Sequence, residues 1–281
     1  MLYTLENERL RLCVDAHGAQ MRSLMKKENG CEYLWPGNAA TWKDSAPWLF
    51  PFIGQMKDGR YVHAGRDYRP PMHGFAKDMD FSVVQTERTL EMTLTDTPDT
   101  LRCFPWRFEL TLRYTLIANE AAIEARVRCR EEKNMLFSFG AHPGFLCEAG
   151  DTLSFAPAAP LHCCRLTADT HLLDRRTETL VSPDLRLEER LFAADAMILC
   201  SPAATQAHLR RKNGRDVRFF FDRSPFVGVW SKPGAGMAYV CVEPWFGVDD
   251  TVDASGALDD KLGVQRLPAG EVFATSMRIV L

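Results

Sequence analysis

Hydrophobic and polar residues alternate along much of the chain, in short stretches that turn residues separate. The clearest example is residues 108–116, FELTLRYTL, in which every second side chain is apolar. Successive side chains of a β-strand point to opposite faces, so this pattern predicts a strand with one buried face. Residues 81–94 and 121–131 show the same alternation and are expected to form strands as well.

Shorter strand-like stretches occupy most of the remaining chain. Each is apolar or alternating, and turn signals rich in Gly, Pro, Asn or Asp separate many of them. These stretches are residues 2–6, 10–15, 19–26, 152–155, 162–166, 196–200, 207–212, 215–221, 226–230, 237–242 and 273–281. Residues 180–190 are expected to form a loop or a helical turn instead.

The spacing of these stretches predicts an all-β fold. Strand candidates recur at intervals of roughly ten residues, and no long amphipathic helix interrupts them. No change of composition marks a linker, so we expect one domain over residues 1–281. At this length, the pattern predicts a large antiparallel β-sandwich rather than a propeller or a solenoid, which would show a repeat.

One predicted strand ends in an unusual way. Residues 237–242, MAYVCV, are uncharged on both faces, as in a strand buried in the centre of a sheet, and Glu243-Pro244-Trp245 follows directly. A carboxyl group at the end of a buried strand is costly unless it is paired or used, and burial raises its pKa toward that of a general base. Glu243 is therefore either a candidate base or half of an ion pair at the sheet rim.

Two histidines stand at breaks in the backbone pattern. His142 follows the apolar residues 135–141, and Pro143-Gly144 ends the strand directly after it. His73 lies between a rigid Pro70-Pro71 and the flexible Gly74. An imidazole in such a setting can act as an acid or base near neutral pH, although most histidines at strand ends and in loops are structural.

Other candidate binding residues have equally plain structural explanations. Arg60 follows the Asp58-Gly59 turn and is either an exposed turn residue or a ligand for hydroxyl or carboxylate groups. Asp195 precedes the short buried run 196–200, where it starts a strand or accepts a hydroxyl. Aromatic faces stack on sugar rings, but tryptophans near these segments are more often core residues; they are Trp48, Trp230 and Trp245.

Charge and cysteine content restrict the class of protein. The 34 basic and 37 acidic residues give a net charge of -3, and no basic block suggests nucleic acid or an anionic membrane as a partner. There is no long apolar segment and no secretory signal pattern. The nine cysteines are odd in number and contain no C-x-x-C pair, which indicates a reducing compartment and predicts a cytoplasmic protein.

Cofactor motifs are missing from the sequence. It contains no phosphate-binding P-loop, no G-x-S-x-G, no EF-hand loop and no dinucleotide fingerprint. His162-Cys163-Cys164 has no second Cys/His group at a spacing typical of zinc sites, so neither a metal nor another cofactor is expected.

Several short motifs occur in a fixed order along the chain: Arg60 after Asp-Gly, MHGFAKD at 72–78, GAHPGF at 140–145, LFAADA at 191–196, VCVEPW at 240–245 and LPAGE at 267–271. Together they resemble the aldose 1-epimerase (galactose mutarotase) family, and most closely its LacX-like branch. The resemblance spans nearly the whole chain. It implies a galactose mutarotase-like β-supersandwich with an open groove on one concave sheet.

The resemblance also implies residue roles. It makes His142 the acid that protonates the ring oxygen of a sugar, and Glu243 the base for the C1 hydroxyl. His73 corresponds to the second histidine of the site, while Arg60 and Asp195 correspond to substrate-binding residues. The Pro143-Gly144 that follows His142 differs from the Asn-His-Ser/Thr-Tyr-Phe-Asn sequence of the better-characterised galactose mutarotases, which indicates a different sugar preference.

The sequence therefore predicts a mutarotase that interconverts the anomers of a hexose, with Trp245 as a further sugar contact. Three alternatives remain open. One is a carbohydrate-binding protein without turnover, and another is a hexose-6-phosphate 1-epimerase, for which basic residues near the site are available: Arg60, Arg66, Arg69 and Lys77. The third is a metal enzyme with His73, His142 and Glu243 as ligands. The oligomeric state does not follow from the sequence.

Overall fold

The computed structural model describes residues 1–180 and 182–281, and antiparallel β-strands make up most of it. The prediction of an all-β protein is confirmed. The larger of the two main sheets has nine strands. In spatial order, they are β18 (Asp184–Arg186), β15 (Thr152–Ala156), β20 (Gln206–Arg210), β21 (Val217–Phe221), β25 (Val272–Val280), β11 (Glu120–Cys129), β10 (Phe108–Ile117), β9 (Thr89–Thr95) and β8 (Ser82–Gln85).

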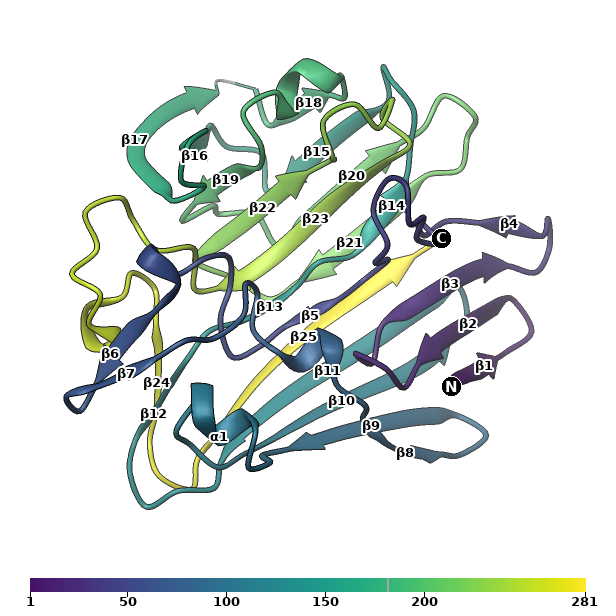
Figure 1. Cartoon of the computed structure of the whole chain (residues 1–281). Coiled ribbons are helices and arrows are strands. Elements are labelled where there is room, and N and C mark those ends of the chain that lie inside the picture. Colours follow the sequence, from purple (N-terminus) through teal and green to yellow (C-terminus); the bar gives the residue numbers. More distant parts are fainter. Residues whose placement is uncertain (181) are drawn as a thin grey trace.

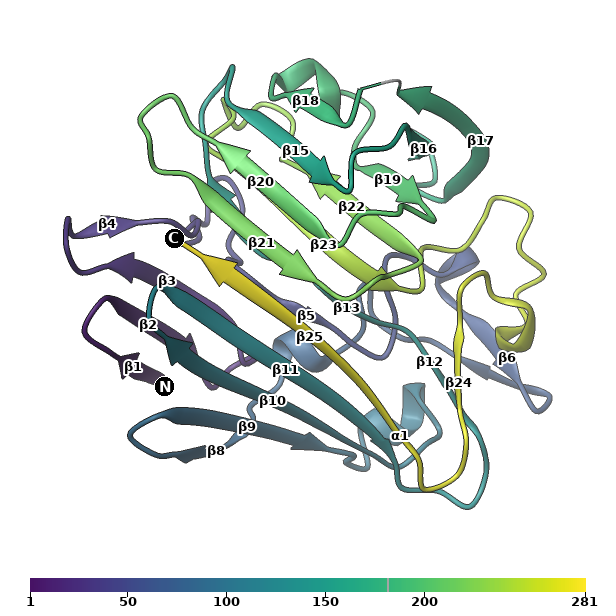
Figure 2. The same ribbon diagram turned by 180° about the vertical axis from the view of Figure 1, so that it is seen from behind.

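The second main sheet has eight strands. It consists of β17 (Leu173–Leu180), β16 (Leu161–Leu166), β19 (Met197–Cys200), β22 (Phe226–Trp230), β23 (Tyr239–Phe246), β13 (Phe139–Ala141) and β5 (Trp48–Leu49), with β14 (Gly144–Leu146) also paired to β23. Figure 1 shows β22 and β23 in front of β20 and β21, and Figure 2 shows the same layers from behind.

Smaller elements complete the chain. They are the four-stranded sheet of β1 (Leu2–Glu6), β2 (Leu10–Asp15), β3 (Met21–Lys26) and β4 (Cys31–Glu32), the hairpin of β6 (Tyr61–His63) and β7 (Arg66–Tyr68), and the pair β12 (Met135–Phe137) and β24 (Gln265–Leu267). Helical turns are short: η1 (Lys57–Gly59), η2 (Ala76–Asp78), α1 (Thr100–Cys103), η3 (Glu189–Phe192) and η4 (Leu258–Asp260). Within the described residues, no helix is long and apolar enough to span a membrane.

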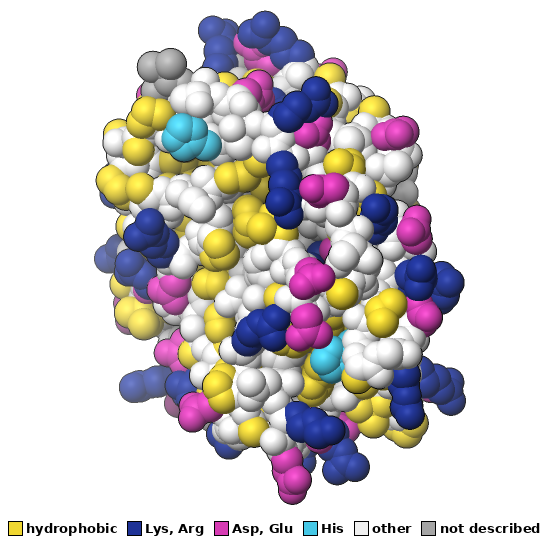
Figure 3. All heavy atoms as spheres, turned by 90° about the vertical axis from the view of Figure 1, so that its left-hand side faces the viewer, with side chains coloured by type: hydrophobic (Ala, Val, Ile, Leu, Met, Phe, Trp, Pro, Cys, Tyr) yellow, Lys and Arg dark blue, Asp and Glu magenta, His cyan; other side chains and the backbone are white. Residues whose placement is uncertain are grey.

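The hydrophobic core lies between the two main sheets. One cluster of buried side chains contains Leu110 and Tyr114 from β10 together with Phe219 from β21, and it extends to Val240 and Val242 from β23. The alternation read in the sequence explains this arrangement, because β10 buries every second residue over most of its length. Figure 3 shows a face on which basic and acidic side chains are interspersed.

Strand β23 is buried on both of its faces, as the uncharged sequence before Glu243 predicts. Its even-numbered side chains Val240 and Val242 point into the core between the sheets. Because neighbouring side chains of a strand alternate, Cys241, Glu243 and Trp245 point to the opposite face of the eight-stranded sheet. That face carries the candidate site.

The expected end of this strand at Glu243 is wrong, since β23 continues to Phe246. Proline lacks the N–H that a ladder needs, yet Pro244 is accommodated here. On one side it pairs with Val227; on the other it faces the gap between β13 and β14, where no ladder pair forms. Glu243 therefore has a fixed position within a strand rather than a place in a turn.

The second half of the chain contains strands that the sequence analysis did not predict, among them β17 and β18. Leu173–Leu180 forms β17, a mostly exposed edge strand, so it lacks the apolar alternation that marks a half-buried strand. Asp184–Arg186 forms β18 at the edge of the nine-stranded sheet, within the stretch 180–190 that was expected to be a loop or helical turn. The helical turn does occur there, as η3.

Candidate active site

A cavity of about 460 Å³ opens on the face of the eight-stranded sheet to which Glu243 and Trp245 point. Most of its polar lining consists of ionisable groups: Lys43, Asp44, His73, Lys77, His142, His171, Asp195, Glu243 and Asp249. Its apolar lining includes Trp42, Trp230 and Trp245. Five of the six predicted site residues therefore line one cavity, and Arg60 is the exception.

His142 and Glu243 face each other across one antiparallel ladder. Gly140 pairs with Trp245 and Gly144 with Cys241, so counting inward along both strands sets His142 opposite Glu243. His142 Nε2 lies 3.2 Å from Glu243 Oε2. The strand break that Pro143 causes frees His142 from the ladder without moving it out of register.

Both of these side chains are buried and carry unsatisfied atoms. Glu243 is 1% exposed, and neither its Oε2 nor His142 Nδ1 has a hydrogen-bond partner among the described residues. The contact between the two residues is close but is not aligned as a hydrogen bond. Buried polar atoms are normally satisfied, so these atoms are available to a ligand that enters the cavity.

Burial shifts the pKa values of Glu243 and His142 in opposite directions. It raises the pKa of Glu243 well above its usual range, and the neighbouring carboxylates Asp195 and Asp249 raise it further. Burial lowers the pKa of His142 well below its usual range, with a smaller effect from His73. Burial therefore disfavours the charged form of both groups, and strongly shifted pKa values of this kind are typical of functional sites.

His73 has a defined orientation. Its ring Nδ1 accepts a hydrogen bond from the Gly54 N–H at 3.0 Å, and the backbone N–H of His73 donates to the Gly54 carbonyl at 2.9 Å. Burial lowers the pKa of His73 to about 4, and Lys77 lowers it as well. A neutral ring that accepts at Nδ1 carries its proton on Nε2, so His73 can donate a hydrogen bond from that atom.

Trp42 is a site residue that the sequence analysis missed. Its ring lies 5.0 Å from that of His142 and stacks on Tyr239 at 5.2 Å, measured between centroids. Gly144 makes room for it, since a Cβ atom there would lie 2.8 Å from Trp42 Cζ3. The Pro143-Gly144 sequence therefore has a second effect besides ending a strand, namely that it admits an aromatic wall.

Trp245 lies flat across glycines of both neighbouring strands. Added Cβ atoms would come within 2.6 Å of its ring at Gly140 and within 2.7 Å at Gly228. The indole is 3% exposed, and its Nε1 has no hydrogen-bond partner among the described residues. The two glycines let the ring press against the sheet and form the floor of the cavity beside Glu243.

Asp195 lies at the partly open side of the cavity. Its backbone has a positive φ of 66°, its Oδ1 accepts the Ala196 N–H, and its Oδ2 lies 3.1 Å from His171 Nδ1. The sequence analysis did not identify His171. It comes from the turn before β17, a segment without a strand pattern that would have drawn attention to it.

The expectation that Arg60 joins the site residues is not supported by its position. Arg60 follows η1 and precedes β6, and its guanidinium is ion-paired with Asp67 of β7. The side chain is 43% exposed and does not line the cavity. The β6–β7 hairpin explains this, because it brings Arg60 and Asp67 together away from the eight-stranded sheet. We leave Arg60 out of the site.

Asp249 and Gln55 also line the cavity, although the sequence analysis did not single them out. Asp249 Oδ1 accepts the Gln55 N–H at 2.8 Å. Burial raises the pKa of Asp249 to about 6. The available signal was the proximity of Asp249 to the Glu243-Pro244-Trp245 sequence.

A possible metal-ligand set differs from the one considered from the sequence. Ligand atoms of His142, Cys241 and Glu243 lie within 4.8 Å of one another, and His73 is not part of this group. Burial raises the pKa of the Cys241 thiol well above its usual range, and Glu243 raises it further. A thiol binds a metal as the thiolate, so a metal ion at this place would have to displace the proton of a buried Cys241.

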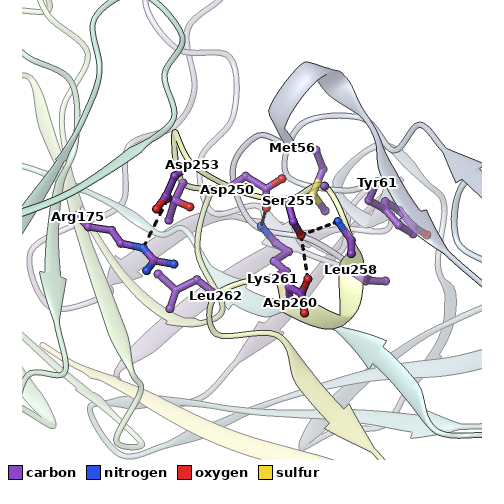
Figure 4. A pocket seen from close by; sticks show the side chains of 14 residues that line it. Met56, Tyr61, Arg175, Asp250, Asp253, Ser255, Leu258, Asp260, Lys261 and Leu262 are labelled. Atoms are coloured by element: carbon purple, nitrogen blue, oxygen red, sulfur yellow. Dashed lines mark hydrogen bonds and ion pairs between the residues drawn. The ribbon is translucent and has the colours of Figure 1, made fainter.

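A second, smaller pocket lies near the loop after β23, and Figure 4 shows its lining. Lys261 Nζ donates to Asp250 Oδ1 at 2.8 Å, and both side chains are buried. Asp250 Oδ2 accepts the Lys57 N–H, and the Asp250 N–H donates to the Gln55 carbonyl. Asp250 therefore ties the loop that carries Asp249 to the segment that carries Gln55, and Lys261 balances its buried charge.

Comparison with known proteins gives this geometry a family. The family model described as aldose 1-epimerase matches residues 1–274. The chain belongs to the aldose 1-epimerase family. Within the curated proteins, it is 28% identical to the chromosomal LacX protein of Lactococcus lactis subsp. lactis, over 95% of each chain. The resemblance read from the motifs is confirmed.

Solved structures agree with this assignment. A galactose mutarotase related enzyme from Lactobacillus acidophilus superposes with a TM-score of 0.95 at 29% identity, covering 100% of this chain and 97% of that one. A galactose mutarotase-like protein from Lactobacillus casei has a TM-score of 0.94 at 24% identity, with 100% and 99% coverage. The predicted galactose mutarotase-like sandwich is therefore confirmed as the fold.

Proposed function

We propose that this member of the aldose 1-epimerase family interconverts the α and β anomers of an aldose by acid/base ring opening and reclosure. His142 acts as the acid and Glu243 as the base. The observation that carries the proposal is the contact of 3.2 Å between His142 Nε2 and Glu243 Oε2, at the floor of a cavity, with unsatisfied polar atoms on both residues.

The reaction requires an acid and a base that lie close together. In a pyranose, the ring oxygen and the C1 hydroxyl are bonded to the same carbon. Glu243 removes the proton of the C1 hydroxyl while His142 protonates the ring oxygen, and the ring opens to an aldehyde. Rotation about the C1–C2 bond then presents the other face of the aldehyde, and the ring closes with the proton transfers reversed.

The opposite pKa shifts suit this reversal. Burial disfavours the charged form of each group, so it raises the pKa of Glu243 and lowers that of His142. Each group gives and takes a proton once per cycle. Burial favours the neutral carboxyl and neutral imidazole that ring opening leaves and from which ring closure starts.

The remaining cavity residues have supporting roles in this proposal. His73 donates a hydrogen bond from Nε2 to the sugar near the reacting carbon. Asp195 accepts a hydroxyl hydrogen bond at the open side. The faces of Trp42, Trp230 and Trp245 supply apolar surface for the C–H groups of a sugar ring, which is a common use of aromatic side chains.

Polarimetry tests the proposal directly. Freshly dissolved α-glucose, α-galactose and hexose 6-phosphates are mixed with the protein, and the change in optical rotation is compared with the spontaneous rate. We expect faster mutarotation for at least one sugar. Glu243→Gln and His142→Asn should each reduce the rate by about 100-fold or more, the usual range for a lost acid or base.

Matched control variants come from the nine-stranded sheet. Glu91→Gln on β9 and His208→Asn on β20 make the same chemical changes outside the cavity and should retain the wild-type rate. If Glu243→Gln and His142→Asn mutarotate sugar as fast as these controls, the site assignment is wrong. Activity that persists in a chelator, in metal-free protein, excludes a metal mechanism through His142 and Glu243.

A carbohydrate-binding protein without turnover is the second candidate function, because aromatic walls and unsatisfied polar atoms also suit binding alone. The two functions are separable by titrating sugars while the intrinsic tryptophan fluorescence is followed. Saturable binding of an aldose with no acceleration of its mutarotation would support this candidate and reject the enzyme.

A further inference from the structure

Asp249 is a buried carboxyl group in the cavity that the proposed acid/base reaction does not use. It follows β23 by three residues and is 4% exposed. It lines the same cavity as Glu243, and its charge contributes to the raised pKa of Glu243. A buried carboxyl group is costly unless its oxygens find partners, so its presence beside the base calls for an explanation.

One oxygen of Asp249 is held in place by the protein. Oδ1 accepts the Gln55 N–H at 2.8 Å. Gly54, the residue before Gln55, permits this approach, because a Cβ atom at Gly54 would lie 1.8 Å from the same oxygen. The carboxyl group is thus packed against backbone that no larger residue could replace without moving it.

The other oxygen has no hydrogen-bond partner among the described residues. Among the described residues, no lysine or arginine forms an ion pair with Asp249, since Lys261 donates to Asp250 and Lys77 pairs with Asp78. Lys261 is near enough to lower the pKa of Asp249, whereas the Asp195 carboxylate raises it, and Glu243 is a second carboxyl neighbour. Such surroundings favour a neutral hydrogen-bond donor as the partner and disfavour an anionic group.

We propose that Asp249 is a further substrate-binding residue, whose Oδ2 accepts a hydrogen bond from one hydroxyl of the bound aldose. This inference rests on the proposed function. Since Asp249 neighbours Glu243, which acts at the C1 hydroxyl, the contacted hydroxyl lies toward the anomeric end of the sugar. The raised pKa of Asp249, about 6, agrees with a carboxyl group that is desolvated until a ligand arrives.

The test variant is Asp249→Asn. Asparagine keeps an oxygen that can accept the Gln55 N–H, but it replaces the free acceptor oxygen by an N–H₂ donor. At pH 8, where Asp249 is ionised, we expect the dissociation constant for the best aldose to rise about tenfold or more, as for a lost hydrogen bond to a charged group. Tryptophan fluorescence provides the measurement, and it does not depend on turnover.

Asp253→Asn is the matched control, because Asp253 lies in the same loop but outside the cavity. It should bind the sugar as the wild type does. Thermal unfolding of both variants verifies that they are folded. If folded Asp249→Asn binds every aldose with the wild-type dissociation constant, the proposal is wrong.

Monodeoxy sugars identify the contact as a hydroxyl. The wild type and Asp249→Asn are each titrated with glucose and with its 2-, 3-, 4- and 6-deoxy derivatives. If Oδ2 accepts a hydrogen bond from a hydroxyl, removing that hydroxyl from glucose weakens binding to the wild type. The same removal weakens binding to Asp249→Asn clearly less, because the variant has already lost the contact. Equal losses in both proteins for every derivative would overturn the proposal.

The outcome also separates this inference from the proposed function. If the wild type accelerates no mutarotation but Asp249→Asn still weakens binding at one hydroxyl, the proposed reaction fails and the role of Asp249 in binding stands. If mutarotation occurs and the variant binds normally, the reaction stands and the role of Asp249 fails.

Discussion

His142 lies directly opposite Glu243 in an antiparallel register, and the break that Pro143 makes in the ladder leaves His142 Nε2 3.2 Å from Glu243 Oε2. Register therefore determines this contact, and flexible loops contribute little to it. A shift of the pairing register by two residues would keep both side chains on the cavity face but move them apart. The positions of the two groups are as rigid as the sheet itself.

The first prediction is that Glu243→Gln loses activity without losing stability. The folded-state pKa of Glu243 is raised, so its carboxyl group stabilises the fold while protonated, and this contribution is lost as the pH rises through that pKa. At pH 8, the neutral amide avoids the cost of a buried charge. Thermal unfolding should show a midpoint equal to or above that of the wild type. Polarimetry should show that the mutarotation rate is reduced by about 100-fold or more.

The stabilities of the wild type and of Glu243→Gln should also diverge as the pH rises. Below the usual carboxyl pKa the two proteins are expected to be similar in stability, and the wild type then loses stability relative to Glu243→Gln. Glu91→Gln, at a half-buried position on β9 outside the cavity, is the control. An inactive Glu243→Gln that also unfolds far below the wild type would mean that Glu243 is mainly structural.

The second prediction concerns the space above Gly144. An alanine Cβ there would lie 2.8 Å from Trp42 Cζ3, so Gly144→Ala should displace Trp42 from His142. We expect the KM for the best aldose to rise several-fold and the stability to fall by about 1–3 kcal/mol, as in overpacked cores. Polarimetry at a series of sugar concentrations and chemical denaturation measure the two effects.

A second substitution shows whether this effect acts through Trp42. Phenylalanine lacks the outer ring that carries Cζ3, so Gly144→Ala/Trp42→Phe should recover stability relative to Gly144→Ala alone. The effects of the two single variants should not add, because the residues are in contact. Additive effects would show that Gly144 influences the site by another route.

The sequence was sufficient for the parts of the site that strands carry. The uncharged residues before Glu243 predicted a buried strand, and the apolar residues before His142 predicted a strand that ends at Pro143. Burial of Glu243 follows from this pattern alone. That the two groups meet could not be read from it, because the pairing of β13 and β14 with β23 is set by long-range register.

The parts that loops carry were less predictable. Trp42, His171 and Asp249 reach the cavity from segments without periodic patterns, so their direction depends on turns and backbone contacts such as Asp249 Oδ1 with the Gln55 N–H. Arg60 is the opposite case. A basic residue after an Asp-Gly turn was a candidate ligand, but its guanidinium is paired with Asp67 outside the cavity.

The third prediction concerns the ion pair behind the cavity. Lys261 and Asp250 are buried, so removing one partner leaves the other charge desolvated. Lys261→Met should lower the free energy of unfolding by about 3–5 kcal/mol, and Asp250→Asn/Lys261→Met should recover part of that loss. Urea denaturation at pH 7 measures both variants.

An exposed ion pair nearby serves as the control. Arg266 and Asp259 are each 53% exposed at a distance of 3.2 Å, so Arg266→Met should cost less than about 1 kcal/mol. If Lys261→Met and Arg266→Met lower the free energy of unfolding by similar amounts, the buried ion pair stabilises the protein no more than the exposed one does.

The fourth prediction is a pH dependence of stability that His73 causes. Burial lowers its folded-state pKa to about 4, from 6.5 for an ordinary histidine. The unfolded chain therefore binds more protons between these values, so the contribution of His73 is present above pH 6.5 and is lost as the pH falls toward 4. His73→Asn removes the titration, and asparagine tolerates the positive φ of 62° found at this position.

Between pH 7 and pH 5, the wild type should lose about 1–2 kcal/mol of stability relative to His73→Asn, because the ring remains partly open to the cavity. The other shifted groups, Glu243, His142 and Asp249, titrate in both proteins and largely cancel in the difference. Urea denaturation across this pH range gives the comparison, and His17→Asn controls for the loss of an exposed imidazole. If the stability curves of the wild type and His73→Asn stay parallel from pH 7 to pH 5, His73 is not held neutral by its surroundings, and its proposed role as an Nε2 donor fails with that result.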